Sequence, residues 1–290
     1  MLAALLLFFA LEKFLANEEA VDLLIFSWRQ NLTMLLLVLL LIPLNWFLET
    51  AKWKQLVSVS EKITWGQACS AVLAGLAIGS ATPNRIGEFA GRVFQMKSTP
   101  VRDGIAFTLV SSAMQVAVTI LFGVFGFLMT DPGKYFHSNK LIVWTILVVV
   151  LGGAAILYVR MAKGKVAKYL EAIRNIKPLV LITVFALSTL RYLVYSVQFF
   201  IMLRLAGIDS GATELFSAIA VNYLVVTIIP SVMFSEIIVR GTVATAVIGG
   251  LCGAPRIVAL AAVVLWMLNV ALPATIGLFF VKNITFFRKK

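Results

Sequence analysis

Residues 79–92 read GSATPNRIGEFAGR and place a proline, two arginines and a glutamate inside an otherwise apolar segment. The chain is apolar from Gly66 to Ala81, breaks at residues 82–84, and becomes apolar again from Ile86 to Met96. A proline removes a backbone donor and kinks or breaks a helix. The pattern therefore predicts two helical arms joined by a break at Pro83.

The composition requires a lipid environment for such a segment. Of 290 residues, 61% are hydrophobic and 13% are charged, and the mean hydropathy is +0.99. A soluble globular chain is about half apolar and about a quarter charged. The net charge of +12 does not indicate nucleic-acid binding, because the basic residues lie in short loops between apolar runs.

Full membrane spans of about 20 residues are predicted elsewhere in the chain. They cover Leu32–Thr50, Gly104–Thr130, Leu141–Val159, Leu179–Leu203 and Ile257–Val281. A second interrupted segment begins at Glu214 and breaks at Pro230. Each interrupted segment is expected to form a hairpin that either re-enters the membrane or crosses it twice.

The basic loops predict the orientation in a cell (inner) membrane. The loop 160–178 carries six Lys or Arg residues, and the C-terminal tail carries four more. Basic loops stay in the cytoplasm, so the C-terminus is expected to be cytoplasmic. The same assignment places five further basic residues in cytoplasmic loops: Lys52, Lys54, Lys62, Lys97 and Arg102.

An internal repeat relates the two interrupted segments. The second copy follows the first by 147 or 148 residues: Ser70, Pro83, Glu88 and Arg92 recur as Ser217, Pro230, Glu236 and Arg240. Each copy precedes a long span with one central amide, Gln115 or Asn269. An odd number of spans separates the copies, which predicts inverted topology and a site near the membrane midplane, where the broken helices meet.

The expected fold is all-α, a polytopic transmembrane helix bundle with two inverted-topology repeats, each containing a broken or re-entrant hairpin. Residues 1–290 form a single transmembrane domain. Repeat 1 covers about 32–130, a connecting span 141–159 and the cytoplasmic loop 160–178 follow, and repeat 2 covers about 179–281.

The charged residues inside the apolar segments are the candidate site. Glu88/Arg92 and Glu236/Arg240 are spaced to pair on one helix face. They form either structural ion pairs or the lining of a polar cavity, in which arginines suit a phosphate and glutamates an amine or a proton.

Two further arginines have alternative interpretations. Arg85, at the first break, is either an entry contact for a substrate or an arginine that reaches the membrane interface. Arg191 lies mid-span, and it either joins the site or donates to a carbonyl of a neighbouring helix.

Several functional classes lack support in the sequence. It has no glycine-rich phosphate loop, no metal-binding Cys/His cluster and no hydrolase nucleophile motif. We therefore expect no cofactor, no metal site and no catalytic residue.

Residues 79–92, together with the segment Pro230–Gly241, resemble the transmembrane region of lysylphosphatidylglycerol synthases and the flippase-like proteins related to it. The resemblance covers the chain from about Leu32 onward. It implies movement of aminoacylated phospholipids or other polar-headed lipids between leaflets. The soluble aminoacyl-transferase domain that follows this region in the full-length synthases is absent from this sequence.

The leading hypothesis is thus a lipid transporter that binds a phospholipid or polyprenyl-phosphate headgroup through Glu88, Arg92, Glu236, Arg240, Arg85 and Arg191. One alternative is a membrane-embedded transferase with a lipid-linked donor, in which Glu88 or Glu236 is the base. Another is an accessory subunit of an envelope enzyme. The expected partners are a membrane lipid and either a second copy of the chain or a separate lipid-synthesising enzyme, and not nucleic acid.

Overall fold

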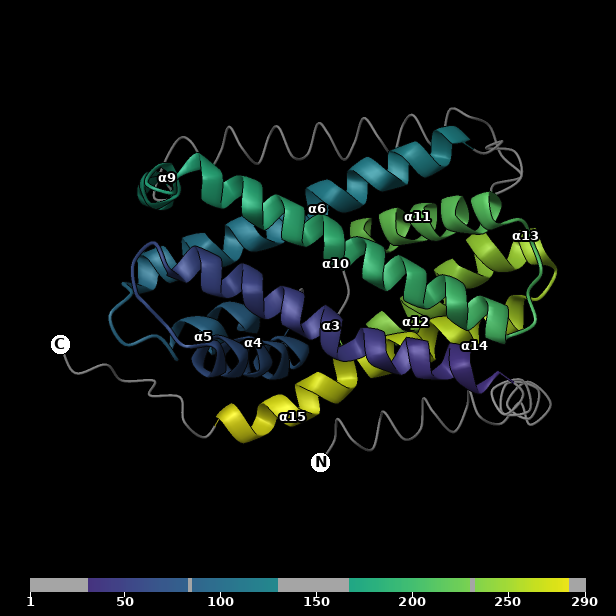
Figure 1. The fold of residues 1–290 in the computed structure, drawn as a ribbon, viewed down its shortest axis with the longest axis horizontal. Helices are drawn as coiled ribbons and strands as arrows, with labels where there is room; N and C mark the ends of the chain where they lie inside the picture. Colours follow the sequence, from purple (N-terminus) through teal and green to yellow (C-terminus); the bar gives the residue numbers. More distant parts are fainter. Residues whose placement is uncertain (1–30, 83–84, 130–166, 230–232, 282–290) are drawn as a thin grey trace.

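A computed structural model of the chain describes residues 31–82, 85–129, 167–229 and 233–281. All regular secondary structure in these residues is helical (Figure 1). The first part contains α3 (Leu32–Val57), α4 (Trp65–Ser80), α5 (Gly87–Val93) and α6 (Val101–Met129). The second part contains α9 (Ala167–Arg174), α10 (Pro178–Leu205), α11 (Ala212–Ile228), α12 (Met233–Ala244) and the π-helix η2 (Thr245–Gly249). The chain continues through α13 (Gly250–Cys252), α14 (Pro255–Trp266), the π-helix η3 (Met267–Ala271) and α15 (Leu272–Val281).

Five of the described helices or continuous helical runs are long and apolar enough to cross a membrane. They are Leu32–Val57, Val101–Met129, Pro178–Leu205, Ser235–Cys252 and Pro255–Val281. Four of them coincide with predicted spans, and the fifth is the second arm of the second hairpin. The predicted span Leu141–Val159 and both hairpin prolines lie outside the described residues.

Local sequence explains where several helices begin. Thr64 caps α4 by accepting from the backbone N–H of Gln67, whose side chain accepts from the backbone N–H of Thr64. Pro178 and Pro255 stand in the first turns of α10 and α14, where a missing N–H costs no helical hydrogen bond.

The prediction that Lys52 lies in a cytoplasmic loop is wrong. The first span does not end at Thr50 but continues as α3 to Val57, and the Lys52 side chain is only 1% exposed. Its ammonium Nζ lies 3.0 Å from Oε2 of Glu49, one turn earlier. A buried ammonium is tolerated when a carboxylate neutralises it, and this pairing allows the helix to continue.

Each interrupted segment starts and finishes at the same end of the molecule. At one end, the Glu61 carboxylate before α4 accepts from the backbone N–H groups of Ser98 and Thr99 after α5, both at 2.8 Å. At the other end, Ser210 Oγ before α11 lies 3.4 Å from Cys252 Sγ after α12. Along the long axis, α4 and α5 occupy one half of the molecule and α12 the other (Figure 1).

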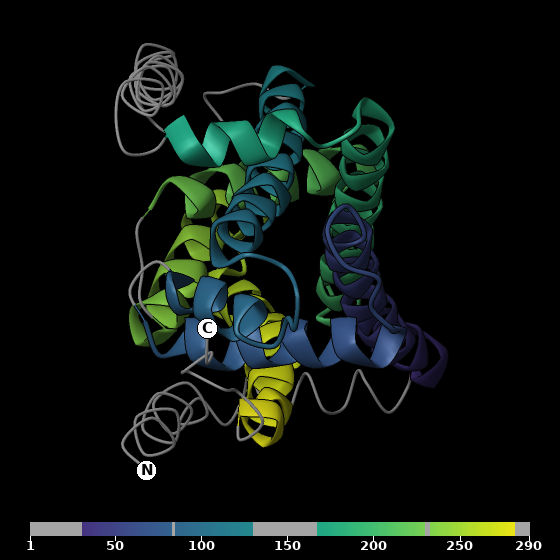
Figure 2. The same cartoon turned by 90° about the vertical axis from the view of Figure 1, so that its left-hand side faces the viewer.

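Close packing of helices distant in sequence holds the bundle together. The helix α3 packs along α10, α4 against α15, and α6 against α11. A Cβ added at Gly277 in α15 would lie 2.0 Å from the carbonyl oxygen of Leu73, and one at Gly126 in α6 would lie 2.9 Å from that of Ser217. These glycines let the backbones approach closely, as is common between membrane helices. Seen end-on, α3 and α10 form one side of the molecule (Figure 2).

Candidate functional site

The carboxylate of Glu49 in α3 is the centre of a buried charge network. Its Oε1 lies 2.7 Å from Nη2 of Arg92 in α5. Its Oε2 lies 3.0 Å from Nζ of Lys52 and 2.9 Å from Nη1 of Arg191 in α10. Arg92 also binds Glu88, four residues earlier in its own helix. Two carboxylates and three cations are therefore joined in one network.

Burial makes this network costly to disrupt. The side chains of Arg92 and Lys52 are 2% and 1% exposed, and that of Glu49 is 8% exposed. The Arg92 guanidinium also lies over the ring of Trp53, 5.4 Å from its centroid. An isolated charge in such surroundings would cost several kcal/mol, so each member stabilises the ionised form of the others.

Glu236 and Arg240, which repeat Glu88 and Arg92, form a smaller network in the other half of the molecule. Nη2 of Arg240 in α12 lies 2.8 Å from Oε1 of Glu236, and its Nε lies 3.1 Å from the same oxygen. Its Nη1 is 3.4 Å from the hydroxyl of Tyr195 in α10. Arg240 thus has one carboxylate partner, whereas Arg92 has two. Both ion pairs predicted from the four-residue spacing form in the structure.

A set of amides joins the two halves. Nε of Arg191 donates to Asn45 Oδ1 at 2.9 Å, and Nδ2 of Asn45 donates to Asn269 Oδ1 at 2.7 Å. Nδ2 of Asn269 in turn donates to Oε1 of Gln198 at 3.0 Å. Asn269 lies in the π-helix η3, and such irregular turns often occur at functional sites.

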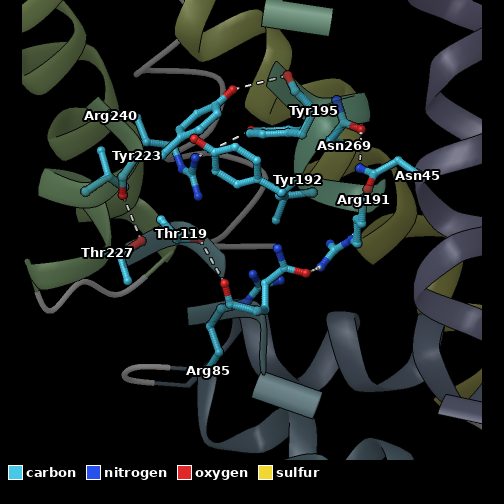
Figure 3. Close-up of a pocket in the computed structure, with 13 residues that line it drawn as sticks. Asn45, Arg85, Thr119, Arg191, Tyr192, Tyr195, Tyr223, Thr227, Arg240 and Asn269 are labelled. Atoms are coloured by element: carbon cyan, nitrogen blue, oxygen red, sulfur yellow. Dashed lines mark hydrogen bonds between the residues drawn. The ribbon is translucent and has the colours of Figure 1, made fainter. Parts of the chain in front are cut away.

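Two cavities lie against these networks. One, of about 360 Å³, is bounded by Glu49, Lys52, Glu88 and Arg92 together with serines and threonine of α6. The other, of about 260 Å³, is bounded by Arg240, three tyrosines, Asn45 and Asn269 among others. The side chains of Arg85, Gln115 and Arg191 line both cavities. Figure 3 shows Arg85, Arg191 and Arg240 reaching the smaller cavity from different elements.

Arg85 differs from the other arginines in its backbone and its partners. Its φ is +58°, and it is the non-glycine residue with positive φ in the described part of the chain. Its Nε and Nη2 are buried, and no described residue accepts a hydrogen bond from them. The closest paired carboxylate oxygen, in Glu88, is 4.0 Å from Nε. A strained residue of this kind with unsatisfied donors is commonly found at functional sites.

The structure brings five of the six predicted residues to the cavities. Glu88, Arg92, Arg85, Arg191 and Arg240 line one or both of them. Glu236 lines neither cavity and reaches the site only through Arg240. Arg191 contacts the side chains of Glu49 and Asn45, so it joins the charged network.

Sequence reasoning missed several members of the site. They are Asn45, Glu49, Lys52, Tyr195 and Tyr223. A signal for two of them existed, because Glu49 lies inside the span predicted over Leu32–Thr50 and Lys52 follows one helical turn later. The tyrosines carry no such signal, since they are common in apolar helices and acquire their role only from their neighbours. Within the described residues, no group of three His, Cys, Asp or Glu side chains is placed to hold a metal ion.

Comparison with known proteins identifies the family. Neither the curated proteins nor the solved structures include a match to this chain. The sequence profile described as the lysylphosphatidylglycerol synthase TM region matches residues 1–277. Together with the apolar spans, this match makes the chain a multi-pass membrane protein. The chain therefore belongs to the family of the transmembrane region of lysylphosphatidylglycerol synthase.

Proposed function

We propose that this chain is a lipid transporter of the flippase type, which moves a polar-headed lipid, such as an aminoacylated phospholipid or a polyprenyl phosphate, between membrane leaflets. The observation that carries the proposal is the charged site between two broken hairpins that start from opposite ends of the molecule. Buried charges inside a helix bundle are expensive and mark a pathway or a binding site for polar groups.

The pairing of the helices supports an inverted repeat, and with it the transport mechanism. The pairings of α4 with α15 and of α6 with α11 are equivalent, because α4 and α11 are the first hairpin arms and α6 and α14–α15 are the spans that follow. The remaining pair joins α3 to its own counterpart α10. This pattern is expected when a two-fold axis in the membrane plane passes between α3 and α10.

Side-chain contacts repeat in the same way. Counted from the start of its helix, each of Asn45, Glu49 and Lys52 in α3 corresponds to Arg191, Tyr195 and Gln198 in α10, respectively. Lys52 donates to Gln115, and its counterpart Gln198 accepts from Asn269. Asn45 and Arg191, which correspond to each other, are joined by a direct hydrogen bond. Such a contact between equivalent positions is expected at the axis.

Helix length favours a re-entrant first hairpin. The seven residues of α5 extend about 10 Å, whereas the hydrocarbon core is about 30 Å thick. The 16 residues of α4 also fall short of a full span of about 20 residues. The first hairpin thus returns to the side of the membrane from which it entered. The basic loops indicate that this side is cytoplasmic.

Alternating exposure of the two hairpins would then move a headgroup past the central arginines while the acyl chains stay in the bilayer. The lipid would be the partner, and the protein would act in the cell membrane with its C-terminus in the cytoplasm. The pairing of Glu88 and Glu236 with arginines suits fixed counter-ions better than the proton acceptor that a transferase needs.

Reconstitution tests the proposal. Proteoliposomes carrying the parent chain are expected to translocate fluorescent phospholipid, and the double variant Glu236→Gln/Arg240→Gln is expected to slow this movement at least about tenfold. The matched control removes the exposed ion pair Arg102–Glu171 by the double variant Arg102→Gln/Glu171→Gln, which should translocate at the parent rate. Equal rates for the parent and the central variant would refute a transport role for this site.

A further inference from the structure

The smaller cavity differs from the larger one in its lining, which has cations but no carboxylate among the described residues. Three guanidinium side chains, those of Arg85, Arg191 and Arg240, line the cavity of about 260 Å³, and no carboxylate of the described part of the chain lines it. The larger cavity contains Glu49 and Glu88 in addition to its cations. Three tyrosines and two asparagines supply the neutral polar groups of the smaller cavity.

The equivalent arginines of the two halves, Arg92 and Arg240, have different partners. Arg92 contacts both Glu88 and Glu49 and is 2% exposed. Arg240 contacts Glu236 and the hydroxyl of Tyr195, which occupies in α10 the place that Glu49 occupies in α3. Its side chain is 18% exposed and lines the smaller cavity. Because a phenol stands where the first half has a carboxylate, Arg240 has Glu236 as its one carboxylate partner among the described residues.

Arg191 and Arg85 share their carboxylate partners with other cations. Arg191 holds one oxygen of Glu49, but it shares this carboxylate with Arg92 and Lys52. The nearest paired carboxylate oxygen to Arg85 Nε is 4.0 Å away, in Glu88, which also binds Arg92.

Among the described residues, the charged side chains of both cavities and their ion-pair partners carry an excess of two positive charges. The cations are Lys52, Arg85, Arg92, Arg191 and Arg240, and the anions are Glu49, Glu88 and Glu236.

We propose that Arg85, Arg191 and Arg240 form an anion site for a phosphate group and that this site selects a net negative headgroup over one that also carries a free amine. Arginine forks match phosphate oxygens, and an excess of buried positive charge is stabilised by an anion and destabilised by a further cation. Arg92 is not a ligand in this site, because it lines the larger cavity and not the smaller one. The lipid source of the phosphate rests on the proposed transport function; the anion site itself does not.

The size and lining of the cavity fit this class of ligand. A volume of about 260 Å³ accommodates a small headgroup and not a pair of acyl chains. The rings of Tyr192, Tyr195 and Tyr223 pack on one another, with centroids 5.2 Å apart for Tyr195 and Tyr223. Rigid aromatic walls keep the arginines in place and reduce the loss of side-chain freedom on binding.

Calorimetric titration of the full chain in detergent tests the site. The probes are short-chain phosphatidylglycerol, its lysyl ester and inorganic phosphate. We expect phosphatidylglycerol to bind at least about tenfold more tightly than the lysyl ester. The variant Tyr195→Glu gives Arg240 the second carboxylate that Arg92 has, and it should weaken phosphatidylglycerol binding at least about tenfold. The variant Tyr195→Gln, which removes the phenol without adding charge, should lose far less.

A second variant keeps the test decisive if Tyr195→Glu does not fold. Arg85→Asn removes the charge and keeps a residue that tolerates positive φ, so it should fold and bind the phosphatidylglycerol probe at least about tenfold less tightly. Inorganic phosphate that binds as tightly as the lipid would support the anion site with a free phosphate as its source. Tighter binding of the lysyl ester, or unchanged binding in Arg85→Asn, would overturn the proposal.

These outcomes are separate from those of the transport assay. A chain that moves lipid but binds the lysyl ester best would retain the proposed function and lose the anion site. A chain that binds phosphatidylglycerol through Arg85 but moves no lipid would retain the site and lose the function.

Discussion

The carboxylate of Glu49 and the guanidinium of Arg92 lie 2.7 Å apart, and both side chains are almost completely buried. Glu49 belongs to the long helix α3 and Arg92 to the short helix α5, so this contact ties the first hairpin to the bundle. Because Glu49 also contacts Lys52 and Arg191, its loss affects three cations together.

We expect Glu49→Ala to destabilise the protein by about 3–5 kcal/mol, because removing one partner of a buried ion pair leaves the other charges uncompensated. Thermal unfolding in detergent measures the effect. The control is Glu171→Ala, since the Glu171 side chain is 68% exposed and its pairing with Arg102 contributes at most about 1 kcal/mol. Equal melting temperatures of the two variants would contradict the role assigned to Glu49.

A second prediction concerns the close packing of α4 on α5. A Cβ at Gly91 would lie 2.5 Å from Cα of Gly75 and 2.6 Å from the carbonyl oxygen of Ala74, and both contacts are to backbone. Gly91→Ala is therefore expected to destabilise the fold by about 1–3 kcal/mol, the usual cost of overpacking. The control Gly66→Ala has nothing within 4 Å of the added Cβ, and it should not lower the melting temperature.

Cysteine labelling tests the predicted orientation. In a background lacking Cys69 and Cys252, Ser60→Cys and Thr213→Cys place exposed thiols before α4 and near the start of α11, respectively. If the basic loops near Ser60 are cytoplasmic, as the sequence predicts, an impermeant maleimide should label Ser60→Cys only in inside-out vesicles and Thr213→Cys only in right-side-out vesicles. Labelling of both thiols from one side would rule out opposite entry of the hairpins.

We expect the stability of the loop around Glu61 to depend on pH. Burial raises the pKa of this carboxyl, but hydrogen bonds from the backbone N–H groups of Ser98, Thr99 and Lys97 outweigh burial, and the pKa lies below its ordinary value of 4.5. Since the folded-state pKa is lowered, the stabilisation is present above about pH 4.5 and is lost as the pH falls through the folded-state pKa.

Melting temperatures over this acidic range compare the parent with Glu61→Gln. The variant cannot ionise, so it should melt lower than the parent above about pH 4.5, and the difference should shrink as the pH falls. A constant difference across the range would show that the carboxylate charge does not hold the loop.

Local patterns in the sequence predicted much of the fold. Apolar length predicted four of the described spans, because about 20 apolar residues are needed to cross a bilayer. The four-residue spacing of Glu88 and Arg92, and of Glu236 and Arg240, predicted both intrahelical ion pairs, because residues four apart share one helix face.

The sequence by itself therefore determined where four of the described membrane helices lie and which charges pair within a helix, since each of these depends on neighbours a few residues away. Only the tertiary structure decided that Glu49 and Lys52 join the site, that Arg191 bonds to Asn45, and that Tyr195 takes the place of a carboxylate beside Arg240. Except for the contact between Lys52 and Glu49, these contacts join residues that are 43 to 146 positions from each other in the sequence. They depend on how helices cross, which no local spacing determines.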